Sequence, residues 1–520
     1  MGHNYSIDSN RRGRAGSPGS TAARTGDAAQ APGGFFPPLA TSTALAAELR
    51  IRIARGDWIE GEKMPSVRRL SEDTGLHRLT VYKAYGLLKE EGLIESREKS
   101  GYYLTVSRQP VETGFGSIRR PRTAAGSNQE PADTEPVLPA LLGELHSVDC
   151  RYQFSQALID PLLLPNSYLA EEAKRVFDLY PRVLGTYAPL QGDEELLVAL
   201  RRYLSETCSF VPEGQELLVT GGAQEAIHLV CEALVRPGDA VLIEQPSYSI
   251  AIEVFKHRNA RLVPVDLHPD GYRLDELEAL MRRHRPVLFY LNPTFHNPTG
   301  RCVPAEQRKH LTDLAEKYGC ILVEDDAFRD VYFGSPPPPP VYGYDTAGNT
   351  IYVRSFSKYI FPGLRIGCLA ARSDLMRRLL TAKARSIGGT PLLNQKVFTH
   401  HFQSERSRRH LHKLRTALQL RKEAMETALE GSGWNWHSPS GGLSLWIELP
   451  EGIDSSRLLA DALAGGPNND ETVSFVPGTF FDPLGRPDRH IRLSYSLLNE
   501  RRIAEGVALL REYAERQLGQ

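Results

Sequence analysis

One lysine of this sequence, Lys358, stands in a setting that suits covalent chemistry. It lies in SFSKYIFPGLRIG, residues 355–367, after two serines and before a Pro-Gly turn. A lysine amine forms a Schiff base with a carbonyl group when partial desolvation leaves it neutral. The hydroxyls of Ser355 and Ser357 and the guanidinium of Arg365 are suitable partners for a phosphate. The segment therefore predicts an imine-forming lysine beside an anion site, whereas a lone loop lysine would be a solvated cation.

A second chemistry, contact with nucleic acid, is predicted near the N-terminus. In residues 41–106, Ser66 is a good N-cap for a short helix, and Gly75 permits a tight turn before a further helix from about Arg78. This arrangement is a helix-turn-helix. The segment LIESREKSGYYLTV then predicts two short strands around a polar turn at 99–101, which form a wing.

The polar side chains of this unit are judged by position, because its eleven basic and ten acidic residues nearly balance. In a helix-turn-helix, early residues of the last helix face base edges while flanking groups hold phosphates. Arginine pairs with guanine, and threonine suits a phosphate or a thymine methyl. The alternative for each residue is a merely solvated side chain. The candidate DNA contacts are Arg68, His77, Arg78, Thr80 and Gly101.

Bulk properties restrict the remaining functions of the 520-residue chain. The net charge of −1 gives no overall basic field, so DNA contact must come from local placement. The six cysteines form no CxxC pair, which predicts neither a metal site nor a disulfide framework. No apolar run is long enough to span a membrane, and the N-terminus lacks the apolar core of a secretory signal. We therefore expect a cytoplasmic protein.

Composition divides the chain into four parts. Residues 1–40 are typical of a disordered tail, and 41–106 form a compact unit. Residues 107–145 are rich in Pro, Gly and polar residues, which indicates a linker. From 146 to 520, short apolar runs alternate with helical stretches, as expected for parallel strands buried under helices. The last part, about 396–520, is expected to form a smaller α+β lobe.

The N-terminal unit resembles the GntR-type winged helix-turn-helix. The matching segments are GDWIEGEKMPSVRRLSEDTGLHRLTV, AYGLLKEEGLI and ESREKSGYYL. The resemblance implies that the second and third helices contact DNA and that the wing reaches the backbone. Leu79 and Tyr82 stand where family members often carry polar or basic side chains, which leaves the base preference open.

The lysine segment resembles that of fold-type-I pyridoxal phosphate (PLP) enzymes, the aminotransferase superfamily. Further motifs follow the family's order: VTGGAQEAIHLV (219–230), EQPSYSI (244–250), HNPTG (296–300), VEDDAF (323–328) and IRLSYS (491–496). The resemblance covers about 150–515. It implies an α/β body with a mostly parallel sheet and helices on both faces, with PLP bound to Lys358 and no metal.

The resemblance also implies a role for each cofactor-binding residue. Backbone amides at the start of a helix hold the phosphate, together with the serines and arginine of the lysine segment. Tyr248 stacks on the pyridine ring, Asn297 hydrogen-bonds its phenolic oxygen, and Asp325 pairs with its nitrogen and keeps the ring an electron sink. The full predicted set is Gly222, Ala223, Gln224, Tyr248, Asn297, Asp325, Ser355, Ser357 and Arg365.

Two more residues receive roles by resemblance, and one departs from the pattern. Arg492 stands where the family grips a substrate carboxylate, and Tyr187 where a residue reaches the phosphate of the neighbouring subunit, which implies a dimer. Family enzymes commonly carry a tyrosine at position 328, where this chain has Phe328, which cannot donate to the cofactor. Either Tyr332 or Tyr359 is left open as a substitute.

A GntR-type head, a long linker and an aminotransferase-like body are the organisation of the MocR/GabR regulators. That resemblance implies a head-to-tail homodimer on promoter DNA. It also implies an amino-compound effector that replaces Lys358 on PLP as an external aldimine. The alternative is an active aminotransferase, for example on 2-aminoadipate or aromatic amino acids, because only the tyrosine is missing. A DNA-binding protein with an inactive body gives no reason for Lys358, Asp325, Asn297 and Arg365 all to be present.

Overall fold

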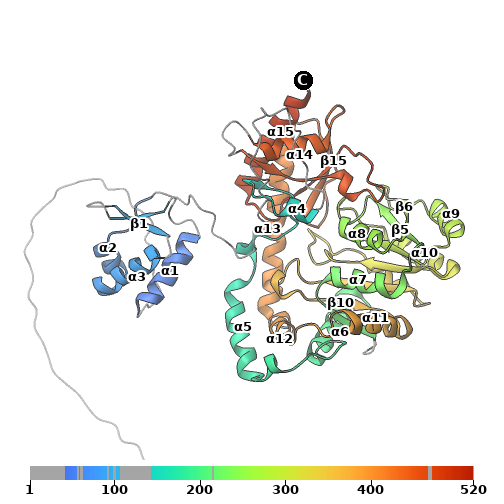
Figure 1. The fold of residues 1–520 in the computed structure, drawn as a ribbon, viewed down its shortest axis with the longest axis horizontal. Coiled ribbons are helices and arrows are strands. Elements are labelled where there is room, and N and C mark those ends of the chain that lie inside the picture. The colour runs from blue at the N-terminus through green and yellow to red at the C-terminus, as the bar shows by residue number, and fades with distance from the viewer. Residues whose placement is uncertain are drawn as a thin grey trace, which may run out of the picture. The chain divides into compact units, whose positions relative to one another are not determined.

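The computed structural model describes residues 41–54, 58, 62–90, 93–97, 101–105, 142–213, 216–465 and 471–518. The predicted tail at 1–40, most of the predicted linker and the tip of the wing at 98–100 lie outside these residues. The chain divides into two compact units, 1–129 and 130–520, which we call the head and the body (Figure 1). Within the described ranges, no helix is both long and apolar enough to cross a membrane.

The described part of the head contains three helices and a two-stranded antiparallel sheet: α1 (Ser42–Ala54), α2 (Val67–Thr74), α3 (Arg78–Glu90), β1 (Ile94–Arg97) and β2 (Gly101–Leu104). The Ser66 hydroxyl accepts a hydrogen bond from the Arg69 amide and so begins α2, and Gly75, with a φ of 69°, ends it. Leu49, Leu70 and Val81 are among the buried side chains that join the three helices. The predicted helix-turn-helix with a wing is therefore confirmed.

The body is built around a seven-stranded sheet with the order β4-β10-β9-β8-β7-β5-β6. Its strands are β4 (Leu217–Thr220), β5 (Ala240–Gln245), β6 (Arg261–Asp266), β7 (Leu288–Leu291), β8 (Ile321–Asp325), β9 (Thr350–Ser355) and β10 (Gly367–Ala370). Strand β10 runs antiparallel to both of its neighbours, and the other pairs are parallel. The mostly parallel sheet that the apolar runs predict is thus confirmed.

Helices cover both faces of this sheet, because alternate strand residues enter different cores. Ile243 and Tyr290 pack in one cluster with Phe255 of α8, whereas Leu242 and Phe289 pack in another with α9 and α10. The helices described between residues 166 and 429, not all of which touch this sheet, are α5 (Asn166–Leu179), α6 (Glu194–Cys208), α7 (Ala223–Leu234), α8 (Ser249–His257), α9 (Leu274–His284), α10 (Ala305–Tyr318), α11 (Ser373–Ser386), α12 (Leu392–Phe402) and α13 (Glu405–Leu429). Single 3₁₀ turns are η1 (Pro161–Leu163), η2 (Val183–Gly185), η4 (Val341–Tyr344), η5 (Pro362–Leu364) and η6 (Gly478–Phe481).

A smaller α+β lobe holds the C-terminal part of the body. Its sheet has the order β11-β12-β15-β14, and β13 pairs in parallel with β3. Its elements are α4 (Leu142–His146), β3 (Tyr152–Gln153), β11 (Asn435–Trp436), β12 (Ser444–Glu448), α14 (Ser455–Ala464), β13 (Val473–Ser474), β14 (Val476–Pro477), β15 (His490–Ser494) and α15 (Glu500–Leu518).

This lobe differs in composition from the predicted 396–520 range. The strap, which we define as residues 152–160, comes from far upstream, yet Tyr152 pairs with Val473 and Phe154 accepts a hydrogen bond from the Ser494 amide. Conversely, α12 overlaps the predicted range but packs against α5 and α6, beside the large sheet. A two-residue parallel pairing between distant segments leaves no periodic signal in the sequence, so the strap could not be placed from local patterns.

Candidate functional site

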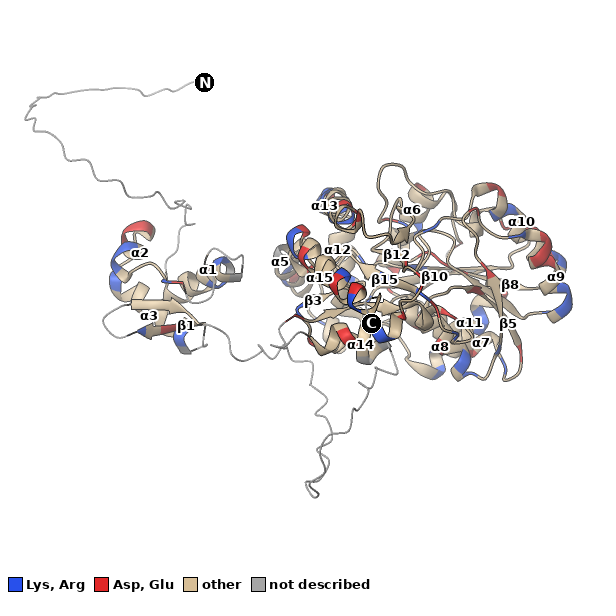
Figure 2. Cartoon of the chain, turned by 90° about the horizontal axis from the view of Figure 1, so that it is seen from above, with Lys and Arg blue, Asp and Glu red and all other residues tan. Residues whose placement is uncertain are grey.

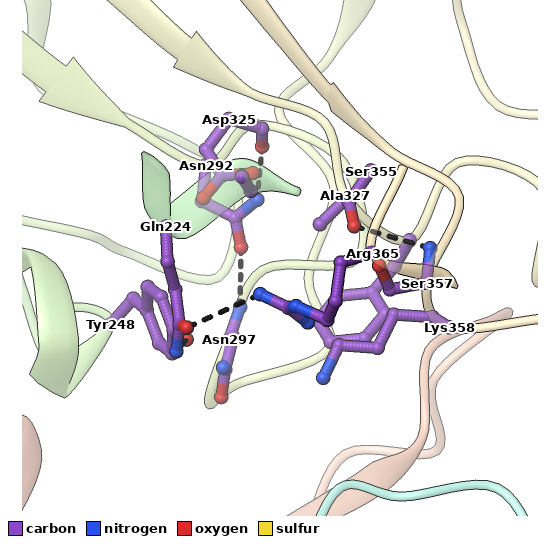
Figure 3. A pocket seen from close by; sticks show the side chains of 12 residues that line it. Gln224, Tyr248, Asn292, Asn297, Asp325, Ala327, Ser355, Ser357, Lys358 and Arg365 are labelled. Atoms are coloured by element: carbon purple, nitrogen blue, oxygen red, sulfur yellow. Dashed lines mark hydrogen bonds between the residues drawn. The ribbon is translucent and has the colours of Figure 1, made fainter. Parts of the chain in front are cut away.

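A pocket opens where the parallel strands of the body end (Figure 3). Crevices at the carboxyl ends of such strands are the usual ligand sites of open α/β sheets. The lining residues follow β4, β5, β7, β8 and β9, so five strand ends converge here. They are Ala223, Gln224, Tyr248, Asn292, Asn297, Asp325, Ala327, Phe328, Ser355, Ser357, Lys358 and Arg365.

One end of the pocket is suited to a phosphate. Helix α7 begins after Gly222, whose φ is 93°, and a Cβ added there would lie 3.1 Å from Nη2 of Arg365 and 3.5 Å from Oγ of Ser357. The glycine therefore leaves a space that a side chain would fill. Oγ of Ser357 is buried and has no hydrogen-bond partner among the described residues, and Arg365 also donates to Gln224 at 3.4 Å. The first amides of α7 lack intrahelical acceptors and complete an anion cradle.

Asp325 offers an unused buried oxygen at the opposite end. Its Oδ2 accepts from the Tyr290 hydroxyl at 2.7 Å, while its Oδ1 has no partner in the described part of the chain. Burial raises the pKa of Asp325 to about 6, although the Tyr290 hydrogen bond opposes this. A buried carboxylate of this kind gains a favourable partner when a protonated ring nitrogen approaches it.

Asn292, which the sequence did not single out, fixes two walls of the pocket. Its Nδ2 donates to the carbonyl oxygen of Asp325, and its Oδ1 accepts from the Asn297 amide at 2.6 Å, as Figure 3 shows. Asn292 thereby ties the end of β8 to the loop that carries Asn297. The signal was present in the sequence as a second Asn-Pro pair, NPTFHNP, five residues before Asn297.

Lys358 lies just beyond the end of β9, and its Nζ donates to the carbonyl oxygen of Ala157 in the strap at 3.3 Å. Burial and the charges of Arg492 and Arg365 lower the pKa of Lys358 to about 8. The carboxylate of Asp325 acts in the opposite direction and offsets part of this effect. An amine with this pKa is neutral in a substantial fraction of molecules near pH 7.5, as a nucleophile requires.

Arg492 of β15 is a buried cation without a carboxylate partner among the described residues. Only 2% of its surface is exposed, and its two terminal nitrogens donate to Oδ1 of Asn297 at 3.0 Å and to the Ser155 carbonyl at 2.7 Å. Its guanidinium lies 5.0 Å from the Phe481 ring centroid, and its Nε is unpartnered. Burial lowers the pKa of Arg492 to about 10. Such a group gains from an incoming anion.

His146 of α4 is a further residue near this cation that sequence reasoning missed. Its Nε2 donates to the Ser155 carbonyl at 3.2 Å, the same oxygen that Arg492 contacts. Burial, followed by the charge of Arg492, lowers the pKa of His146 to about 4, so the ring is neutral at physiological pH. Through Ser155 and Ala157, the strap therefore receives hydrogen bonds from His146, Arg492 and Lys358.

The structure brings most of the predicted cofactor residues together. Each of them lines the pocket except Gly222, which stands at its edge, and Tyr187, which does not line it. Tyr187 is 99% exposed, and its role toward a neighbouring subunit stays a prediction.

Phe328 lines the pocket, and neither proposed substitute replaces its missing hydroxyl. The Tyr359 hydroxyl donates to Asp330, and the Tyr332 ring lies 3.6 Å from the Arg415 guanidinium. Neither tyrosine is among the residues that line the pocket.

The predicted DNA contacts lie on the outer parts of the head. Arg68 is exposed on α2 and pairs with Glu72 at 3.0 Å, and the colours of Figure 2 mark both basic and acidic residues along α2. His77 precedes α3 and accepts from the Leu79 amide at 3.3 Å. Arg78 is exposed and Thr80 is half-buried at the start of α3, and Gly101, with a φ of 116°, opens β2.

Taken together, the body contains a phosphate cradle, an activated lysine, an unpaired buried carboxylate and an aromatic side chain at Tyr248. This donor set fits pyridoxal phosphate, and with the sheet order it defines the class of PLP-binding, aminotransferase-like proteins. The head adds a winged helix-turn-helix to that class.

Comparison with known proteins agrees with both assignments. Residues 165–509 match the family described as aminotransferase class I and II, and residues 41–104 match the bacterial regulatory proteins of the gntR family. The chain therefore belongs to the class I and II aminotransferase family and carries a GntR-family DNA-binding head.

Individual relatives include both enzymes and regulators. The chain is 35% identical to the 2-aminoadipate transaminase of Thermus thermophilus, over 69% of this chain and 88% of the relative. It is 28% identical to the uncharacterized HTH-type transcriptional regulator YisV of Bacillus subtilis, over 90% of this chain and 94% of the relative. A crystal structure of the α-aminoadipate aminotransferase LysN from Thermus thermophilus aligns with a TM-score of 0.67 at 32% identity, covering 73% and 95% of the two chains.

Proposed function

We propose that this protein is a transcription regulator that senses an amino compound carrying a carboxylate, through the pocket around Lys358. The observation that carries the proposal is the buried guanidinium of Arg492, which has no anionic partner among the described residues and adds to the charge that lowers the pKa of Lys358. Because a DNA-binding head is part of the same chain, ligand binding in the pocket can change DNA binding. We also propose that the protein acts in the cytoplasm, as a head-to-tail homodimer on promoter DNA.

Each part of the pocket has a distinct task in this proposal. When bound, pyridoxal phosphate supplies an aldehyde carbon that captures primary amines. Ser357, Arg365 and the first amides of α7 hold its phosphate, and Asp325 holds a proton at its ring nitrogen. Lys358 would hold the cofactor through its amine, and Arg492 would orient an effector by its carboxylate.

Regulation requires that the effector bind two arrangements of the protein with different affinity. In the described structure, Lys358 and Arg492 both donate to carbonyls of the strap. An effector whose carboxylate draws Arg492 away would weaken its contact with Ser155, and one that takes the place of Lys358 on the cofactor would leave that amine free to donate to Ala157. Either change would alter the stability of the strap. The strap lies at the end of the body nearest in sequence to the head, so it is a direct route for coupling.

The second candidate function is catalysis of amino-group transfer. It is favoured by the presence of Lys358, Asp325 and Arg365 in the pocket and by the 35% identity to a transaminase. Phe328 disfavours it, because no hydroxyl stands at that position to donate to the cofactor. The two functions differ in turnover, since enzymes of this kind typically reach about 1–10³ s⁻¹.

A mobility-shift assay with the full-length, PLP-loaded protein tests the proposal. The probe is a duplex that the protein itself enriches from a random-sequence library, and the panel contains α- and ω-amino acids, amines and oxo acids. At least one amino acid is expected to change the affinity for the duplex by about 5–150-fold, the range of common allosteric couplings. Oxo-acid release is measured on the same samples.

Three variants sharpen this assay. Lys358→Ala should keep basal DNA binding and lose the response, and Arg492→Gln should lose the response to carboxylate-bearing compounds selectively. Lys309→Ala removes an exposed lysine that pairs with Asp313 and should change neither property. An unchanged response in Lys358→Ala would refute sensing at this lysine. Oxo-acid release at ordinary enzymatic rates, without any effect on DNA binding, would favour the catalytic alternative.

A further inference from the structure

The outward face of α3 carries an unusual set of side chains for a helix that reads DNA. The buried face consists of Val81, Ala84, Tyr85 and Leu88. At 100° per residue, the opposite stripe consists of Leu79, Tyr82, Lys83 and Gly86. Two large apolar or aromatic side chains and one cation, all exposed, therefore share the outward face with a half-buried glycine.

Leu79 and Tyr82 are large side chains that do not pack in the core of the head. Their exposed fractions are 57% and 59%, and they stand three residues apart, so they adjoin on the helix surface. Burial, followed by the nearby Tyr82 hydroxyl, raises the pKa of Tyr102 of β2, and the rings of Tyr102 and Tyr85 lie 4.7 Å apart. Tyr82 thus lies beside the wing, while the isobutyl group of Leu79 projects from the first turn of α3.

The positive charges around Leu79 and Tyr82 favour a polyanion as the partner of this face. Arg78 and Lys83 flank the pair and form no ion pair with any described residue. Both cations are exposed, and the N-terminal end of α3 adds the positive end of a helix dipole. A duplex satisfies both requirements, because its phosphates meet the cations while the C5 methyl of thymine is an apolar group in the major groove.

Gly86 lies on the same outward face of α3, and the packing of the head does not require a glycine there. A Cβ added at Gly86 would meet no heavy atom within 4 Å, and its backbone has no left-handed φ. Glycine within a helix is destabilising relative to alanine, so its presence here has a cost within the head. A bare position on the outward face lets another backbone approach the helix closely.

We propose that Leu79 reads the C5 methyl of a thymine in the operator, and that Gly86 gives the sugar–phosphate backbone room beside α3. Tyr82 positions this contact from the side of the wing, and Lys83 binds a phosphate without reading sequence. The inference rests on the proposed binding of promoter DNA and adds the chemical identity of a base that the head selects. An apolar contact at this position replaces the polar readout that arginine would give to guanine.

Removing single methyl groups from the DNA tests this contact. The full-length protein enriches a duplex from a random-sequence library, and each thymine of that duplex is then replaced singly by deoxyuridine, which lacks only the methyl group. One buried methyl corresponds to about fourfold in affinity, so at least one replacement per half-site should weaken binding by about that factor. Leu79→Ala should abolish the difference between thymine and deoxyuridine at that position and leave other positions unchanged.

Matched variants separate this role from general effects. Leu484→Ala removes an equally exposed leucine of the body, 55% exposed against 57%, and should leave binding unchanged. Lys83→Ala should weaken binding to thymine and deoxyuridine duplexes equally and lower the salt slope by about one. Gly86→Ala should raise the thermal stability of the protein while it weakens DNA binding.

Two results would overturn the inference and can be told apart. If the wild-type protein binds every deoxyuridine duplex as tightly as the parent, or if Leu79→Ala keeps the full difference, Leu79 does not read a thymine methyl. If no duplex is enriched at all, the proposed binding of promoter DNA fails, and this inference fails with it.

Discussion

Replacing Asp325 by asparagine is expected to stabilise the cofactor-free protein while it weakens PLP binding. The carboxyl group is buried, one of its oxygens has no partner in the described structure, and its pKa is raised from 3.8 to about 6, chiefly by burial. An asparagine still accepts from the Tyr290 hydroxyl through its carbonyl oxygen but carries no buried charge. It also cannot neutralise a protonated ring nitrogen, so the same change removes the favourable contact with the cofactor.

The magnitude follows from the shift in pKa. A carboxyl with a higher pKa in the folded protein than in the unfolded chain binds protons more tightly when folded, so stability falls as pH rises between those two values. A shift of about two units corresponds to about 3 kcal/mol above pH 7 and to less than about 1 kcal/mol at pH 4. Asp325→Asn should therefore gain about 2–3 kcal/mol at pH 8 and almost nothing at pH 4.

Urea denaturation of the cofactor-free protein at pH 4, 6 and 8, followed by circular dichroism, measures this difference. Asp330→Asn is the matched control, because Asp330 is also buried but its pKa is lowered overall: the charge of Arg354 and the hydroxyls of Tyr203 and Tyr359 outweigh burial. Asp330→Asn should therefore lower the free energy of unfolding at pH 8, whereas Asp325→Asn should raise it. Equal or lower stability of Asp325→Asn at pH 8 would refute the reasoning.

Three further predictions concern other parts of the body. Competitive acetylation of the cofactor-free protein should show that Lys358 becomes reactive with a midpoint near pH 8, because only the neutral amine is acylated. A midpoint near pH 10.4, as for an ordinary lysine, would contradict its lowered pKa. Gly222→Ala should weaken PLP binding at least tenfold in equilibrium dialysis, since its Cβ enters the phosphate cradle, whereas Gly143→Ala, in open space, should not. Arg421→Met removes the buried cation that pairs with partly buried Asp160 at 2.7 Å and should destabilise the protein by about 3 kcal/mol in urea denaturation.

The parts of the site that follow a strand end closely in sequence could be predicted. Lys358, Arg365 and Asp325 belong to short motifs in which the strand, the turn and the functional side chain are contiguous. The alternation of apolar strands and helices likewise predicted the parallel sheet, because each element is defined by its own residues. The helix-turn-helix was accessible for the same reason: Ser66 and Gly75 mark the helix ends locally.

The contacts that tune these residues could not be predicted, because they join segments far apart in the chain. Tyr290 and Asn292 reach Asp325 only because β7 and β8 are neighbours in the sheet. The strap carbonyl of Ser155 is shared by Arg492 and His146, whose elements have no sequence pattern in common. The lowered pKa of Lys358 depends on those arrangements and so is a property of the fold.

The strap determines where this body can be cut from the rest of the chain. The family match begins at residue 165, downstream of every strap residue. A fragment started there would keep the sheet, the lysine and the aspartate. It would lack the acceptors for Lys358 and Arg492 as well as the strand that lies beside β13. A fragment that keeps these contacts, together with that of His146 in α4, must therefore start upstream of Leu142. Fusions to other DNA-binding heads should be joined in the part of the predicted linker that precedes Leu142, not at the family boundary.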